Sequence, residues 1–447
     1  MTENHQACIA TSATRWERAK RWIDQRTGGL AGEFVVLSGS TVLLQGATVI
    51  VSVVLAGILG PVLYGDWNLV VIVVTYLSYL QFGVTNAMNR EVPIAIGAEE
   101  LDRAHLIRSV ALGGSLVAAL LGGVIITCIP PDWISPNLRR AALLGGAVYL
   151  FGYHAFAYMK THFESAMRFD RSSMLKAILA ALTIVLTLPL AVRWGVSGAI
   201  TGQGLAYLAA SGLAFVLTRV DVRPAFDLTD WKRLVQIGLP IMLVGIAYTV
   251  LTTIDRWILI RYVGAEAVGL YAFVVRLLSP TLLLTGLIAA QMYPRVAQEW
   301  GRNRSVSSLM PLVKGQVIAT LGLTGAVSVS LLAILPVVVP RLWPDFSRSM
   351  EILPILLVGM LFLPQCGIFG VLLNVLDRQV PYLLVQVLMV GLALAIGIPL
   401  TKAFGLIGTA WAASATYLLY LVSMIVVTGF VLRAVQREFE PGRGRRS

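Results

Sequence analysis

Three ionisable residues lie deep inside long apolar segments of this chain. Asp255 and Arg256 fall in the run 234–262, and Arg276 falls in the next run, 266–290. If both runs are helices, Asp255 and Arg276 lie roughly 13 to 18 Å from the short turn that joins them, at 1.5 Å of rise per residue. An ionisable group at that depth in a bilayer costs a few kcal/mol or more unless it is paired or wetted. Each is therefore a candidate binding residue, and the alternative is a silent structural ion pair of Asp255 with either arginine.

Neutral polar side chains follow two earlier apolar runs, 34–58 and 65–88, at the spacing of one helix face. The first stripe carries Ser38, Thr41, Gln45, Thr48 and Ser52, and the second carries Tyr76, Tyr79, Gly83, Asn86 and Arg90. One such stripe is explained equally well by helix packing and by a water-filled cavity. Two adjacent stripes favour the cavity.

Two more polar residues are candidates for the same region. Thr252 lies four residues before Arg256, on the same helix face. His154 falls near the middle of the run 140–164, and its imidazole titrates close to physiological pH, so it could relay a proton. A histidine that is hydrogen-bonded between helices is the commoner arrangement, and both interpretations are kept.

A glycine-marked turn between two apolar runs occurs twice, which predicts a tandem duplication. With a shift of 204 positions the turn pairs Gly60 with Gly264, Gly65 with Gly269, and Trp67 with Tyr271. A second match, at a shift of 210, sets Gly195-Val196-Ser197-Gly198 against Gly405-Leu406-Ile407-Gly408. Each half of the chain is therefore expected to repeat the same architecture.

The composition is that of a membrane protein. Of the 447 residues, 57% are hydrophobic and 13% are charged, about half the charged fraction of a soluble domain. Apolar runs of roughly 20 residues are long enough to cross a bilayer. We expect an all-α polytopic protein with twelve transmembrane helices in two pseudo-symmetric six-helix lobes, at 34–58, 65–88, 106–129, 140–164, 174–192, 196–218, 234–262, 266–290, 311–339, 350–374, 381–401 and 405–432.

Lys and Arg are concentrated on one side of this arrangement, which predicts that both termini are cytosolic. The expected order is a basic cytosolic segment (1–33), the first lobe (34–219), a cytosolic linker (220–233), the second lobe (234–432) and a basic cytosolic tail (433–447). The opposite, outer interface should then hold Trp67, Trp133, Trp194 and Trp343, each partly wetted. The formal charge of +12 points to anionic lipid headgroups as partners and not to nucleic acid, because the basic residues lie in short loops and at the termini.

Sequence signs of catalysis are lacking. The chain contains no glycine-rich phosphate loop, no HExxH and no CxxC, and its three cysteines, Cys8, Cys128 and Cys366, are too scattered for a metal site. We therefore expect neither an enzyme nor a bound metal or organic cofactor.

Several short motifs resemble those of the polysaccharide-export flippases. They are Leu37-Ser38-Gly39-Ser40, Leu59-Gly60-Pro61 with Tyr64-Gly65, Arg90-Glu91-Val92-Pro93, Asp255-Arg256 and Val268-Gly269-Leu270-Tyr271. These flippases are the Wzx-type transporters of the multidrug/oligosaccharidyl-lipid/polysaccharide (MOP) superfamily, which includes the MATE transporters. The resemblance covers nearly the whole chain apart from the two tails.

The resemblance implies that two lobes surround a cationic cavity, and that alternating access carries a polyprenyl-diphosphate-linked oligosaccharide from the inner to the outer leaflet of the cell (inner) membrane. Arg276 and Arg256 would then face the diphosphate, with Arg90 nearer the entrance, since guanidinium matches phosphate oxygens. Gln45, Tyr76, Tyr79 and Asn86 would offer hydrogen bonds and ring faces to sugars. Asp255 or His154 could couple the cycle to H⁺ or Na⁺, although uncoupled exchange fits equally, and other polysaccharide-assembly membrane proteins are conceivable partners.

Two other functions stay open at this point. A MATE-type cation-coupled exporter of small molecules would be expected to carry a deep acidic residue in the first half, and the first two helical runs contain none. A membrane polysaccharide polymerase or ligase would be expected to carry clustered carboxylates or histidines in long outer loops.

Overall fold

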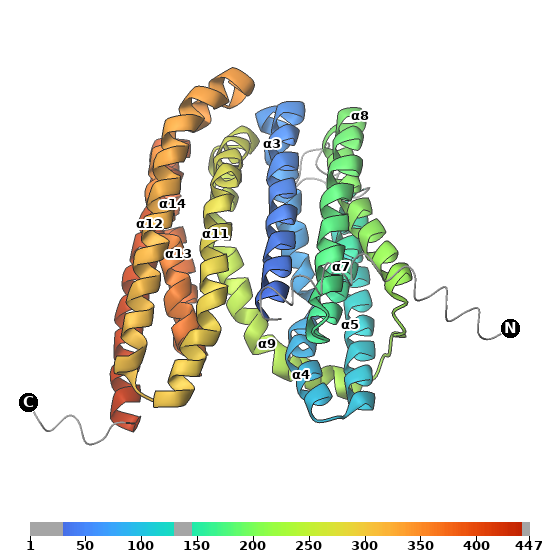
Figure 1. Cartoon of the computed structure of the whole chain (residues 1–447). Coiled ribbons are helices and arrows are strands. Elements are labelled where there is room, and N and C mark those ends of the chain that lie inside the picture. The colour runs from blue at the N-terminus through green and yellow to red at the C-terminus, as the bar shows by residue number, and fades with distance from the viewer. Residues whose placement is uncertain (1–29, 129–144, 440–447) are drawn as a thin grey trace, which may run out of the picture.

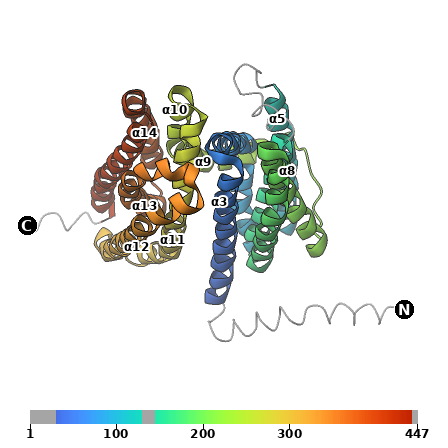
Figure 2. The same cartoon turned by 90° about the horizontal axis from the view of Figure 1, so that it is seen from above.

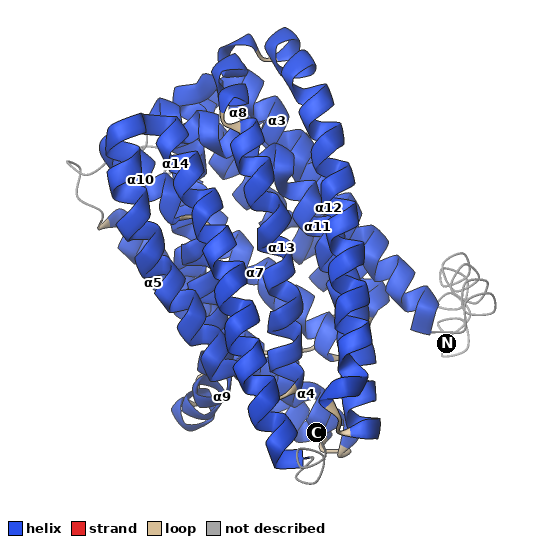
Figure 3. Cartoon of the chain, turned by 90° about the vertical axis from the view of Figure 1, so that its left-hand side faces the viewer, coloured by secondary structure: helices blue, strands red, loops and turns tan. Residues whose placement is uncertain are grey.

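The computed structural model describes residues 30–128 and 145–439, and all regular structure in these ranges is helical (Figure 3). The elements are α3 (Leu30–Leu77), η1 (Ser78–Gln81), α4 (Val84–Gly97), α5 (Leu101–Thr127), α7 (Ala147–Ser165), α8 (Phe169–Thr218), α9 (Leu228–Leu251), α10 (Ile254–Tyr262), α11 (Ala265–Asn303), α12 (Val306–Leu342), η4 (Pro344–Glu351), α13 (Leu353–Val375) and α14 (Gln379–Phe439). Predictions for residues 1–29, 129–144 and 440–447, including Trp133, lie outside the described residues.

Three of these helices, α3, α8 and α14, are long enough for two membrane crossings, and each contains a glycine that divides it. Backbone angles leave the helical region at Gly60 in α3, at Gly195 in α8 and at Gly405 in α14. Positive φ values near 60° to 70° are easily reached by glycine and strained for other residues. Division of these three helices turns the eight spans that are long and apolar enough to cross a membrane, with α9 and α10 counted as one, into eleven. Helix α7, described from Ala147, supplies the twelfth predicted membrane helix.

The backbone repeats between the two halves, as the sequence predicts. Gly195 and Gly405 adopt almost the same angles, with φ of 58° in both and ψ of −134° and −131°. Gly198 and Gly408 pack closely against Leu190 and Leu400, which are also 210 positions apart. The first lobe (α3 to α8) and the second lobe (α9 to α14) lie side by side, with α3 and α11 facing each other between them (Figures 1 and 2). We call the end that carries the three kinks the outer end, following the predicted orientation, and the opposite end the inner end.

The repeated turns bring the two lobes together at the outer end. A Cβ atom at Gly65 would overlap the backbone oxygen of Ala265, and one at Gly269 would overlap that of Pro61. The contact is reciprocal because the two glycines occupy equivalent positions of the repeat. Because neither Gly65 nor Gly269 has a side chain, the backbones of α3 and α11 can touch at this point.

An aromatic cluster fills the space around this crossing. Tyr64 packs against Trp67 at 5.1 Å and Phe346 at 5.8 Å between ring centroids, and Phe273 contacts Phe346 at 4.5 Å. The prediction that Trp67 is partly wetted is wrong: it is 2% exposed, and its Nε1 donates a hydrogen bond to Gln203 Oε1 at 3.2 Å. Trp194 is 57% exposed, as expected, and Trp343 is half-buried. Packing of α3 against α8 within the first lobe, which the sequence pattern does not encode, contributes to the burial of Trp67.

Substitution of Gly65 by alanine should destabilise the protein by about 1–3 kcal/mol, because the obstructing atom is backbone and cannot rotate away. Gly46→Ala in the same helix is the matched control, since a Cβ at Gly46 meets no atom within 4 Å. Thermal unfolding in detergent measures both. Equal melting temperatures for the two variants would contradict the close crossing of α3 and α11.

On the inner side, α9 leans out of the second lobe and packs on the first (Figure 1). Gly83 on the first lobe and Gly238 on α9 make a second backbone contact, in which an added Cβ at either position would overlap the other residue. Gly83 lies in the break between η1 and α4 and has φ of 78°. The two lobes are therefore joined at the outer end by α3 with α11, and on the inner side by α4 with α9.

Candidate functional site

The seventh membrane crossing is broken where Asp255 and Arg256 lie. Helix α9 ends at Leu251 and α10 begins at Ile254, with Thr252 and Thr253 between them. Arg256 donates hydrogen bonds from Nη1 to the backbone oxygen of Thr252 at 2.6 Å and to Asp255 Oδ1 at 3.4 Å. Asp255 Oδ1 also accepts a bond from the backbone N–H of Arg256 at 2.8 Å. The break therefore holds a buried ion pair whose members are 7% and 6% exposed.

Half-helix ends explain why this pair is tolerated. The cation sits at the C-terminal end of α9 and the anion in the first turn of α10, so each meets the favourable end of a helix dipole. The Arg256 guanidinium also lies over the ring of Tyr271 at 5.6 Å. The sequence left open whether Asp255 pairs with Arg256 or with Arg276, and the structure shows the pair with Arg256. The guanidinium of Arg256 is therefore already bonded within the protein, to Asp255 and to Thr252.

Arg276 has a different environment. It projects from α11 and is half-buried, and it forms no ion pair with any carboxylate of the described residues. Its charge acts on the hydroxyl groups of Tyr64, Tyr149 and Tyr207, all of which belong to the first lobe. Arg256 also acts on Tyr64, so both guanidinium groups lie near the same phenol. An arginine of the second lobe thus faces tyrosines of the first, without a counter-ion.

The facing tyrosines belong to a cluster, Tyr149, Tyr153 and Tyr207, that the sequence analysis missed. Tyr149 and Tyr207 stack at 5.6 Å with an interplanar angle of 17°, and Tyr153 meets Tyr207 edge-on at 5.8 Å. Tyr149 and Tyr153 lie four residues apart on α7, which is a helical-face signal, but the predicted cavity included only the first two helices. Tyrosines that line a polar site present both ring faces and hydroxyl groups to a ligand.

Tyr76 and Tyr79 bridge the two lobes at mid-depth. The Tyr76 hydroxyl lies 2.6 Å from Thr253 Oγ1 and accepts a bond from Trp257 Nε1 at 3.3 Å. The Tyr79 hydroxyl lies 2.6 Å from Thr249 Oγ1. Both tyrosines therefore hold the break in the seventh crossing against the first lobe.

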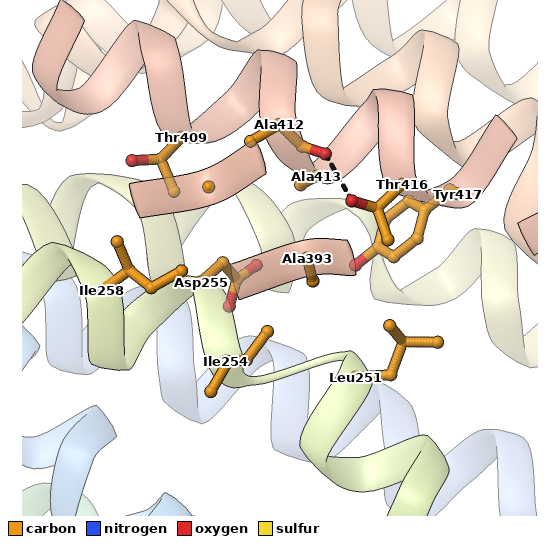
Figure 4. A pocket seen from close by; sticks show the side chains of 11 residues that line it. Leu251, Ile254, Asp255, Ile258, Ala393, Thr409, Ala412, Ala413, Thr416 and Tyr417 are labelled. Atoms are coloured by element: carbon orange, nitrogen blue, oxygen red, sulfur yellow. Dashed lines mark hydrogen bonds between the residues drawn. The ribbon is translucent and has the colours of Figure 1, made fainter. Parts of the chain in front are cut away.

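Asp255 also lines a small pocket, which lies among helices of the second lobe (Figure 4). It is lined by Leu251, Ile254, Asp255, Ile258, Ala393, Gly397, Thr409, Ala412, Ala413, Thr416 and Tyr417. Its polar members are one carboxylate, two threonines and a tyrosine. Carboxylate, hydroxyl and carbonyl oxygens are the ligands of hard cations, and a carboxylate is also a proton acceptor.

The remaining predicted residues are more dispersed. Gln45 and Arg90 are exposed, Asn86 and Thr252 are half-buried, and Thr252 Oγ1 bonds to the backbone of Tyr248 at 3.0 Å. His154 is 3% exposed and interacts with the backbone of Leu77 within the first lobe. The structure therefore brings Asp255, Arg256, Thr252, Tyr76 and Tyr79 together at the break, with Arg276 facing the tyrosine cluster. It does not bring His154, Gln45 or Arg90 to that break.

Comparison with known proteins gives the family and the fold. Residues 30–300 match the family model described as polysaccharide biosynthesis protein. The search of curated proteins found no match. Among solved structures, an inward-facing multidrug resistance MATE transporter of the MOP superfamily has a TM-score of 0.74 at 15% identity, covering 91% of this chain and 99% of its own.

Two other structures extend the comparison. The lipid II flippase MurJ, in an inward closed conformation, has a TM-score of 0.71 at 12% identity, covering 90% of both chains. An outward-facing MATE transporter of the MOP superfamily has a lower TM-score of 0.64 at 15% identity, covering 91% of this chain and 96% of its own. At these identities the likeness is one of fold, and it agrees with the twelve-helix arrangement in two lobes.

Proposed function

This chain belongs to the polysaccharide biosynthesis protein family of MOP-type transporters and flippases, and from that premise we propose that it flips a polyprenyl-diphosphate-linked oligosaccharide across the cell (inner) membrane. The substrate would enter from the inner leaflet and leave in the outer leaflet, for assembly of an O-antigen, a capsule or an exopolysaccharide. Both termini would be cytosolic.

Arg276 carries the proposal. A half-buried guanidinium without a carboxylate partner among the described residues costs free energy in a membrane unless an anionic ligand or water compensates it. The diphosphate of the substrate supplies two groups that guanidinium binds in a bidentate manner. We assign Arg256 a supporting role, because its guanidinium is already bonded to Asp255 and Thr252.

The tyrosine cluster suits the sugar part of such a substrate. Tyr149, Tyr153 and Tyr207 surround the region that Arg276 faces, and their rings and hydroxyl groups match the apolar faces and hydroxyl groups of sugars. Because arginine and tyrosines come from opposite lobes, a substrate that contacts both would respond to any relative movement of the lobes. Such a site suits alternating access.

The two lobe contacts would serve as gates in this cycle. The outer gate is the crossing of α3 with α11 and its aromatic cluster, and the inner gate is the smaller contact of α4 with α9. The higher TM-score against the inward-facing than against the outward-facing MATE structure supports a conformation that is sealed at the outer end.

Asp255 is the proposed coupling residue. Its carboxylate borders both the ion pair and the small pocket, so protonation, or binding of Na⁺ in the pocket, would change its bond to Arg256. His154 is the weaker candidate, because it is buried among helices of the first lobe, away from the break. Transport without ion coupling remains the alternative for this step.

Mass spectrometry of membrane lipids in a strain deleted for this gene tests the function. We expect a completed polyprenyl-diphosphate oligosaccharide to accumulate, and to disappear when the gene is restored. The fold also matches MATE exporters, so drug sensitivity should be measured in the same strains. Unchanged lipid pools with altered drug sensitivity would replace the flippase proposal with a cation-coupled exporter.

A further inference from the structure

Five basic residues gather at the inner end of the first lobe, away from the site described above. They are His105 and Arg108 on α5, His162 on α7, Arg168 in the turn before α8, and Arg171 in the first turn of α8, and we call them the basic cluster. The charges of the three arginines and of His105 all act on His162, and Arg168 acts on Arg108 and on Arg171. Like charges this close repel each other unless an anion lies between them.

The described residues supply almost no compensating charge. None of the three arginines lies within 4 Å of a described carboxylate. Asp170 acts on Arg171 from a greater distance. Glu164, at the end of α7, is already paired with Lys176 at 3.1 Å. The cluster therefore has a net positive charge that the protein itself leaves unneutralised.

Buried polar nitrogens of the cluster also lack partners. Arg108 Nε, which is a donor, and His162 Nδ1 are buried and have no hydrogen-bond partner among the described residues. Among the described residues, Arg171 alone of the three arginines has a partner for its guanidinium, through a long bond of 3.5 Å to the backbone oxygen of Thr218. The N-terminus of α8 adds positive potential, since no side chain caps it. A buried guanidinium N–H without a partner, together with several cations, indicates a site for an anion with multiple acceptor oxygens.

The second lobe shows the same turn without these features. Met167 and Asp377 are 210 positions apart and both have left-handed angles, with φ of 55° and 56°. The following N–H groups, of Arg168 and Arg378, bond to Phe163 and Leu373 at 2.9 Å and 2.8 Å. The backbone of this turn is therefore the same in both lobes.

The side chains of the second turn are different. Arg378 forms an ion pair with Glu438 at 2.9 Å, whereas Arg168 has no such partner among the described residues. His162 and Arg171 correspond to Leu372 and Pro381, and Leu372 belongs to a buried apolar cluster. The second lobe forms the same turn with an apolar interior and a closed ion pair. The fold of this turn therefore does not require the basic cluster.

We propose that the basic cluster binds the phosphate of an acidic phospholipid headgroup on the inner side of the membrane. Arg168 and Arg171 lie between the predicted spans 140–164 and 174–192, at headgroup depth, and His105 lies just before the predicted span 106–129. Arg168 and His105 are exposed there, so a ligand can reach the site. Met167, beside Arg168, is 63% exposed and would lie near the acyl chains. This assignment is independent of the substrate that the chain transports.

The test is the thermal stability of the purified full-length protein in detergent, titrated separately with phosphatidylglycerol, phosphatidylcholine and inorganic phosphate. Phosphatidylglycerol should raise the melting temperature of the wild type, and phosphatidylcholine should not. In Arg168→Gln/Arg171→Gln the half-saturating concentration of phosphatidylglycerol should increase about tenfold or more. The matched control Arg378→Gln should respond as the wild type does.

The lipid-free melting temperature separates binding from folding. It should not fall in the double variant, because no ion pair is lost and like charges are removed. A wild-type response of the double variant, or equal effects of the two phospholipids, would overturn the proposal. Saturation by inorganic phosphate at lower concentrations than phosphatidylglycerol would overturn the assignment to a lipid.

Discussion

Replacement of Arg276 by alanine should lower transport about a hundredfold or more, because a buried charged hydrogen bond to the diphosphate is typically worth 2–5 kcal/mol. Arg276→Lys should retain part of the activity, since it keeps the charge but loses the bidentate geometry. The amount of completed oligosaccharide exported by a deletion strain carrying each variant measures the effect.

The matched control is Arg261→Ala, which removes the same charge from an exposed position at the end of α10, where the guanidinium lies over Tyr262 at 5.4 Å. Export should be close to that of the wild type. Equal activity of Arg276→Ala and Arg261→Ala would contradict a substrate-binding role for Arg276. Loss of the Arg276→Ala protein from the membrane would instead point to a role in folding, so its abundance must be measured in parallel.

Replacement of Asp255 by alanine should destabilise the protein by about 3–5 kcal/mol, because Arg256 would be left buried without its counter-ion. The thermal unfolding of the purified protein in detergent measures this. The double variant Asp255→Ala/Arg256→Met should recover most of the loss, since an apolar side chain of similar length replaces the orphaned cation.

A stable Asp255→Ala protein would show that the ion pair does not hold the break in the seventh crossing. Transport by Asp255→Asn then addresses coupling, because the amide keeps the shape of the side chain but cannot carry a negative charge. If Asp255 is the coupling residue, transport by this variant should no longer depend on a gradient of H⁺ or Na⁺.

Much of the fold could be predicted from the sequence, because membrane helices need long apolar runs and the turns that divide them need glycine. The pairing of Gly195 with Gly405 anticipates identical backbone angles in the structure. Breaks at Gly83 and at Thr252 were not predicted, since the apolar runs continue through both. Hydropathy indicates whether a segment lies in the membrane or in water. It does not indicate where the helix axis bends within an apolar segment.

The site was less predictable than the fold. Sequence spacing found Asp255, Arg256 and Arg276 because charge in an apolar run is conspicuous, but it could not choose the partner of Asp255. Tyr149, Tyr153 and Tyr207 were missed because the charge of Arg276 reaches Tyr149 and Tyr207 only through the arrangement of the two lobes, and Tyr153 joins them by packing on Tyr207. The burial of Trp67 depends on packing within the first lobe, where its bond to Gln203 on α8 spans 136 positions of sequence.

Reconstitution is the most direct test of the flippase proposal. Purified protein in liposomes would be supplied with a fluorescent polyprenyl-diphosphate oligosaccharide, and a quencher outside would report the lipid that reaches the outer leaflet. We predict rapid exposure with the wild type and with Arg261→Ala, and a rate close to that of empty liposomes with Arg276→Ala. Equal rates for protein-containing and empty liposomes would contradict flipping of this class of lipid, and undiminished flipping by Arg276→Ala would contradict the binding role of that arginine.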